Sequence, residues 1–115
     1  MTRHSGWLAL VLLLGSAGSC LAQAPHHCAA DAAAKARALL ALHLDDAELA
    51  RSAAVDASVK ILPPIKALKG NGRFDVLELW GHVHKADYRL RLIYARIKSS
   101  CVLMGQELIE ASDPY

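Results

Sequence analysis

The fold of this chain is decided by residues 74–97, which read FDVLELWGHVHKADYRLRLIYARI. Apolar and polar side chains alternate along both halves of this stretch, and such period-two alternation predicts two half-buried strands. The apolar positions of one parity are Leu77, Leu79, Val83, Tyr88, Leu90 and Leu92. An even-length turn around Lys85 and Ala86 puts all of them on one face, so we expect an antiparallel hairpin in that register.

The opposite face of the hairpin is the candidate binding face, and it carries Trp80, His82, Arg89 and Arg91. We expect Trp80 to lie opposite Arg91 and His82 opposite Arg89. Such cross-strand pairs contribute roughly 0.2–1 kcal/mol each. Tryptophan and arginine are frequent anchors of binding interfaces. Alternation separates two faces without saying which is buried, so an arrangement with Trp80 beneath the helices stays open.

The chain has a formal net charge of +2, but its charges are unevenly distributed. Residues 60–98 carry nine basic and three acidic side chains, whereas residues 23–59 and 99–115 each have a net negative charge. A basic middle suits an anionic partner in the cell envelope, and an ordinary solvated sheet face is the alternative. We expect no nucleic-acid partner.

Residues 28–44 are rich in strong helix formers and predict a helix whose apolar stripe contains Ala38, Leu39 and Leu42. A second, short helix is expected before residue 59, because an aspartate followed by a glutamate is typical of a capped helix start.

Two further segments complete the predicted sheet. Residues 59–68 predict an edge strand or a polyproline-like segment, since Pro63 and Pro64 exclude a central strand. Residues 69–73 have the composition of a loop. Residues 102–110 fit either a third hairpin strand or a helix, and we favour the strand. The prediction is an α+β domain with one or two N-terminal helices packed on a small antiparallel sheet.

The amino terminus has the three parts of a signal peptide in order. Arg3 and His4 supply positive charge, residues 7–14 are an apolar run too short to cross a membrane, and small residues follow. Cleavage after Ala22 is favoured over cleavage after Ala24, which would leave a proline directly after the cut. We therefore expect residues 1–22 to be removed.

The predicted mature chain is one domain, residues 23–115, with no transmembrane segment and a periplasmic or secreted location. It keeps two cysteines, Cys28 and Cys101. Because exported proteins meet an oxidising compartment, we expect these two to form a disulfide that ties the helices to the end of the sheet. Anchoring as a lipoprotein at Cys20 is the alternative, and it leaves the same cysteine pair.

The histidines are the candidate metal ligands. His26 and His27 lie near the predicted mature start, and His82 and His84 are two apart on a predicted strand, so both rings should point to one face. Imidazole binds copper, nickel and zinc, although a typical zinc site has four ligands. If Pro25 were the first residue, a free amino group and His27 in third position would chelate Cu(II) or Ni(II).

The sequence contains no nucleophile elbow, phosphate loop or His-Glu-x-x-His motif, so no catalytic residue is assigned and no cofactor is expected beyond a metal ion. Three functions stay open: a non-catalytic module that binds another envelope component, a metal-handling protein, and a small hydrolase or its inhibitor. We favour the first.

Three blocks of sequence resemble small exported proteins of proteobacteria whose function is unknown. The blocks are FDVLEL at 74–79, YRLRLIY at 88–94 and CVLMGQE at 101–107. The resemblance covers about a third of the chain. It implies an exported location and no particular activity.

Overall fold

The computed structural model describes residues 15, 24–84 and 86–115. The predicted signal peptide, including Cys20, lies outside the described residues except for Gly15. Two helices precede five strands: α1 (Ala29–Leu44), α2 (Ala47–Ser52), β1 (Ala54–Val55), β2 (Lys60–Lys66), β3 (Arg73–Val83), β4 (Ala86–Ala95) and β5 (Leu103–Glu110). The α+β prediction is confirmed.

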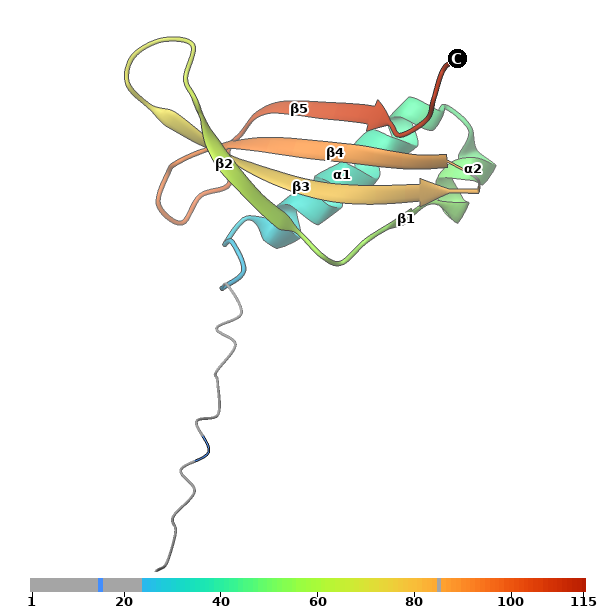
Figure 1. Ribbon diagram of the computed structural model, residues 1–115, viewed down its shortest axis with the longest axis horizontal. Helices are drawn as coiled ribbons and strands as arrows, with labels where there is room; N and C mark the ends of the chain where they lie inside the picture. The colour runs from blue at the N-terminus through green and yellow to red at the C-terminus, as the bar shows by residue number, and fades with distance from the viewer. Residues whose placement is uncertain (1–14, 16–23, 85) are drawn as a thin grey trace, which may run out of the picture.

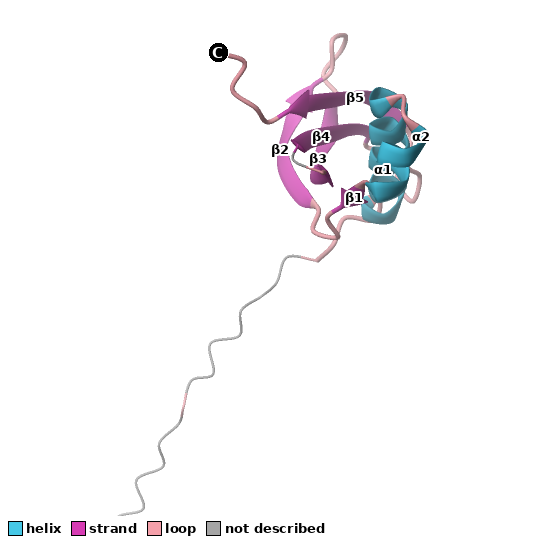
Figure 2. Ribbon diagram, turned by 90° about the vertical axis from the view of Figure 1, so that its right-hand side faces the viewer, coloured by secondary structure: helices cyan, strands magenta, loops and turns pink. Residues whose placement is uncertain are grey.

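All strand pairs are antiparallel, and the sheet order is β1-β3-β4-β5. The strand β2 also pairs with β3, on the same edge as β1. Helix α1 covers one face of this sheet, and the far part of β2 bends toward the other side (Figures 1 and 2). Neither helix of the described residues has the length and apolar character of a membrane-spanning helix.

Helix α1 turns a stripe of small residues toward the sheet. The buried positions recur every four residues and are Cys28, Ala32, Ala36 and Leu40, all 0 % exposed. The predicted stripe was wrong at Ala38, which is exposed, and at Leu42, which is 76 % exposed, whereas Leu39 is partly buried and packs against the core. Alanine or leucine occupies most positions of α1, so apolar periodicity does not identify its buried side. Because the sheet approaches the helix closely, the buried side is the one that carries the small alanine side chains.

A glycine in β3 permits this close approach. A Cβ atom at Gly81 would lie 2.8 Å from Cδ2 of Leu40 and 3.3 Å from Cδ1 of Leu90. The first separation is shorter than carbon atoms tolerate without displacement. Because Gly81 has no side chain, the surface of β3 has a depression at this position, and the side chain of Leu40 packs into it.

The β3–β4 hairpin has the predicted faces and a different register. Val83 pairs with Ala86, so Trp80 lies opposite Arg89 and Glu78 opposite Arg91. The predicted pairing of Trp80 with Arg91 and of His82 with Arg89 was wrong by two residues, because Val83 and Ala86 close the turn, which therefore lies one residue earlier than the predicted turn around Lys85 and Ala86. A shift of two residues preserves side-chain parity, which is why the faces were still correct.

The chain enters this tight turn through His84, whose φ is 51°. Two-residue hairpin turns require a positive φ, which glycine and asparagine adopt most readily. The residues His84 and Lys85 are not a recognisable turn sequence, so the pattern gave no sign that the turn begins this early.

The two outer strands behave as predicted. Pro63 and Pro64 lie at a register shift in the edge strand β2, between Leu62 and Ile65. The strand preference at 102–110 is confirmed, since β5 pairs with β4 along its length. A helix over residues 106–111 is excluded.

The predicted disulfide is confirmed. Cys28 and Cys101 are bonded, with a Cα–Cα distance of 5.6 Å, and they join the start of α1 to the chain just before β5. A second link between the layers lies nearby, where the hydroxyl of Tyr94 donates to Oδ2 of Asp31 at 2.7 Å. Lys35 donates to both oxygens of the same carboxylate at 2.8 and 2.9 Å. The hydrogen bonds from Lys35 and then from Tyr94 lower the pKa of Asp31.

Candidate functional site

The four residues of the candidate binding face lie together on the side of the sheet opposite α1. Trp80 is 36 % exposed and is the direct cross-strand neighbour of Arg89. The other parity is buried under α1, where Leu77, Leu79, Leu90 and Leu92 are all 0 % exposed. The inverted arrangement, with Trp80 beneath the helices, is therefore excluded.

The arginines of this face are already paired with glutamates. Nη2 of Arg89 donates to Oε1 of Glu107 on β5 at 2.9 Å, and Nε of Arg91 donates to Oε2 of Glu78 on β3 at 2.9 Å. Glu107 also lies 4.0 Å from Nη1 of Arg91. The basic middle of the sequence is therefore not a bare positive surface in three dimensions.

Arg89 retains unused hydrogen-bonding capacity. Its Nε atom is buried and has no partner among the described residues. A buried donor without a partner is uncommon in folded proteins. Among the described residues, the guanidinium group beside Trp80 is thus held by a single hydrogen bond to Glu107.

His82 lies between two carboxylates at the rim of the face. Its Nδ1 is 2.6 Å from Oδ1 of Asp87 on β4, and its Nε2 is 3.0 Å from Oδ2 of Asp56. The backbone N–H of Asp56 donates to the carbonyl of Trp80 at 2.9 Å, which fixes the segment after β1. The hydrogen bonds to Asp87 and then to Asp56 raise the pKa of His82, because only the imidazolium donates through both nitrogens.

This pairing predicts a pH-dependent contribution to stability. Because the pKa of His82 in the folded chain is above its ordinary 6.5, the contribution is complete below that pH and is lost as the pH rises through the raised pKa. We expect His82→Asn to reduce the fall of the melting temperature between about pH 6 and pH 9, measured by circular dichroism.

The matched control is His84→Asn, which replaces an exposed histidine two residues away. Asparagine tolerates the positive φ at this position. The control should keep the pH dependence of the wild-type chain. Equal pH profiles for wild type and His82→Asn would contradict the assigned role of the two carboxylates.

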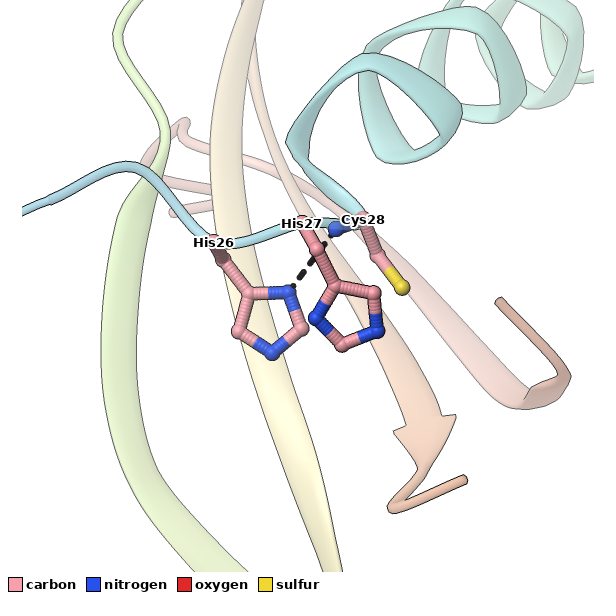
Figure 3. A group of neighbouring side chains, drawn as sticks. All are labelled: His26, His27 and Cys28. Carbon is pink, nitrogen blue, oxygen red and sulfur yellow. Dashed lines mark hydrogen bonds between the residues drawn. The ribbon is translucent and has the colours of Figure 1, made fainter. Parts of the chain in front are cut away.

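The histidines near the start of α1 are held by other contacts. The rings of His26 and His27 are stacked with centroids 4.6 Å apart (Figure 3). Nδ1 of His26 accepts from the N–H of Cys28 at 3.0 Å, and Nε2 lies 3.0 Å from Oδ2 of Asp75. Nε2 of His27 lies 3.2 Å from the carbonyl oxygen of Ser100.

The same cluster holds Asp75 in its charged form. Burial of Asp75 opposes ionisation, but hydrogen bonds from His26 and from Nε of Arg96, at 2.7 Å, outweigh it and lower the pKa of the carboxyl. Asp75 thereby joins the start of α1 to β3 and to the segment after β4.

As a metal centre, the cluster has an incomplete donor set. The ligand atoms of His26, His27 and Cys28 lie within 4.8 Å of one another. However, Sγ of Cys28 is bonded to Cys101 and is not a thiolate. Both nitrogens of His26 are also engaged. His27 alone contributes a free ring nitrogen, so among the described residues this group falls short of a four-ligand site.

The predicted histidine pair on the hairpin is separated by the turn. His84 follows the end of β3 and lines a shallow groove with Leu44, Leu49 and Tyr88 on the α1 side, whereas His82 faces its two aspartates. The expectation that both rings point to one face was wrong, because strand alternation ends at Val83. The histidines near α1 also lie far from those of the hairpin. His26 contacts Asp75, and positions 75 and 82 are seven residues, or roughly 23 Å, apart along β3.

Sequence reasoning missed the acidic partners of the face. The alternating pattern places Glu78 on the same face as Trp80, but its pairing with Arg91 was not predicted, because the predicted register set Arg91 opposite Trp80. Glu107 and Asp56 are brought in by β5 and by the segment after β1, and no local pattern indicates those contacts.

No hydrogen bond joins a histidine ring to a serine, threonine or cysteine side chain anywhere in residues 24–84 and 86–115. These residues therefore contain no hydrogen-bonded pair of a histidine base and a hydroxyl or thiol nucleophile. Comparisons with known proteins returned no match to a family model, to a curated protein or to a solved structure.

Proposed function

We propose that this chain is an exported, non-catalytic binding module that docks onto another component of the cell envelope through the candidate binding face. The exposed Trp80, held next to Arg89 on the paired strands β3 and β4, is the observation that carries the proposal. Tryptophan and arginine are the residues most enriched at the energetic centres of interfaces. A side chain mounted on a strand also loses little conformational freedom on binding.

The charges around Trp80 favour a protein partner with a mixed polar surface. Two arginines lie beside Glu78 and Glu107, and His82 lies between two aspartates, so both signs of charge are interspersed. We expect an anionic group of the partner to bind Arg89. The ion pair of Arg89 with Glu107 is partly exposed, so breaking it costs little free energy.

The proposal predicts that Trp80→Ala weakens binding to the envelope partner roughly thirty-fold or more, as is typical of a tryptophan at an interface centre. The partner is first captured from envelope extract with the wild-type chain and identified by mass spectrometry. Affinity is then measured by titration calorimetry with the purified partner. Ile97→Ala is the matched control, because Ile97 is also an exposed apolar residue, 48 % exposed, and lies outside the face.

Arg89→Ala is the second variant, and it should weaken both the affinity and its dependence on salt. Arg91 is less suitable, because its removal leaves the nearly buried Glu78 without its partner and affects folding. If Trp80→Ala binds the partner as tightly as the Ile97→Ala control does, the face is not the binding site.

A further inference from the structure

The two edges of the sheet are protected very differently. The edge formed by β1 and β2 carries Lys60, Lys66 and the two prolines, which are features that prevent an edge strand from pairing with another chain. The other edge is β5, eight residues long and paired only with β4. It has neither lysine nor proline, and exposed apolar residues lie along it, with Met104 at 53 % and Ile109 at 47 %.

The backbone direction along β5 identifies which groups are free. The N–H of Ala111 donates to the carbonyl of Asp87 on the β4 side at 2.8 Å. In an antiparallel ladder, backbone groups of successive residues point alternately to the two neighbours. Positions 105, 107 and 109 therefore point toward β4, and the N–H and C=O groups of Gln106, Leu108 and Glu110 point to the open edge.

An apolar groove runs beside this edge on the α1 side of the sheet. It has a volume of about 240 Å³ and is lined by Lys35, Ala38, Leu39, Leu42, Leu103 and Gln106. Helix α1 packs over β3 and β4 and leaves this flank of β5 uncovered. A strand added to the edge would therefore gain backbone hydrogen bonds from β5 and would place alternate side chains in the groove.

We propose that a second copy of this chain occupies the edge, through antiparallel pairing of β5 with β5 about a two-fold axis at Gln106. In this register Glu107 of one copy faces Gly105 of the other, and the two Gln106 residues exchange backbone hydrogen bonds at the axis. A register two residues further along would set Glu107 against Glu107, and like charges directly opposite are destabilising. The sequence of β5 thus favours the first register.

The charges beside the groove are also complementary between copies. Glu110 lies on the α1 side of the sheet, since it pairs with the buried Tyr88. Antiparallel pairing brings Glu110 of the second copy beside the start of β5 in the first copy. Lys35, which also pairs with Asp31 of its own copy, lines the groove near that point. Glu107 pairs with Arg89 of its own copy and faces Gly105 of the other copy in the proposed register, so two glutamates do not meet.

The test is the molar mass of the full chain, as the producing cell processes it, measured by sedimentation equilibrium. We expect twice the monomer mass for the wild type. Gln106→Pro removes only an N–H that faces the open edge and leaves the pairing of β5 with β4 in place. Two central hydrogen bonds are then lost, and dimerisation should weaken roughly thirty-fold.

Gln106→Lys is the second variant, because two lysines would then meet at the axis and also oppose dimerisation. Asn71→Lys makes the matched change from an amide to a lysine in the exposed loop between β2 and β3 and should dimerise like the wild type. Hydrogen exchange of the wild type should show protected amides at 106, 108 and 110. A monomeric wild type overturns the proposal and leaves the edge to a strand of another protein. A dimer that survives both Gln106 variants overturns it as well.

Discussion

Replacing Cys28 and Cys101 together by alanine is expected to lower the free energy of unfolding by about 4 kcal/mol. The crosslinked residues are 73 positions apart, and the disulfide removes the entropy that so long a loop would have in the unfolded chain. Small domains of this kind have total stabilities of roughly 5–15 kcal/mol, so the disulfide supplies at least about a quarter of the free energy of unfolding. Urea unfolding followed by circular dichroism measures the change.

Reduction of the wild-type chain provides the control, since it opens the same loop without altering any carbon atom. The reduced wild type and the double variant should unfold at similar urea concentrations. Alanine at position 28 extends the buried alanine stripe of α1 and leaves no polar group there. A loss of stability below about 1 kcal/mol in the double variant would contradict the assignment of the disulfide as the main constraint on the unfolded chain.

Leu40→Ala should cost about 3 kcal/mol, the second large effect. Leu40 is 0 % exposed and its Cδ2 fills the space over Gly81, so truncation removes buried apolar surface and leaves a cavity between α1 and β3. Leu68→Ala is the matched control, because the same change affects a fully exposed leucine in the loop after β2. Its effect should stay within about 0.5 kcal/mol.

A double-mutant cycle tests the contact itself. Gly81→Ala alone should destabilise by about 1–3 kcal/mol, since the new methyl group overlaps Leu40. In the double variant Gly81→Ala with Leu40→Ala, the methyl group occupies the cavity. The combined loss should therefore be clearly smaller than the sum of the two single losses. Strict additivity would mean that Gly81 is not required for the approach of α1.

The sequence was most informative where its pattern had only one structural explanation. Alternation from Leu77 to Leu92 identified the hairpin and both of its faces, because side-chain direction in a strand has a period of two. The register failed at His84, where the turn depends on a backbone conformation that the residue type does not indicate. Helix α1 was located correctly, but its buried side was decided by the space over Gly81, which is a property of the neighbouring strand.

For the candidate binding face as well, the sequence predicted what lies close together along the chain and did not predict contacts between distant segments. The four predicted residues of the face come from one hairpin and could be grouped by parity alone. Asp87 and Glu78, which pair with His82 and Arg91, also lie in the hairpin. The other two acidic partners come from β5 and from the segment after β1, at sequence distances of 18 for Glu107 to Arg89 and 26 for Asp56 to His82. Such contacts follow from strand order, and strand order beyond the hairpin is not determined by local periodicity.

The position of the disulfide also governs what a single backbone cut can do. Residues 28 and 101 close a covalent ring that contains both helices and the strands β1 to β4. The segment Leu68 to Gly72 within that ring is fully exposed and is the natural place for a protease to act. A cut there divides the chain into two fragments that stay covalently joined, so the sheet keeps all of its strands. The nicked molecule is a two-chain protein whose fragments separate only when the crosslink is reduced.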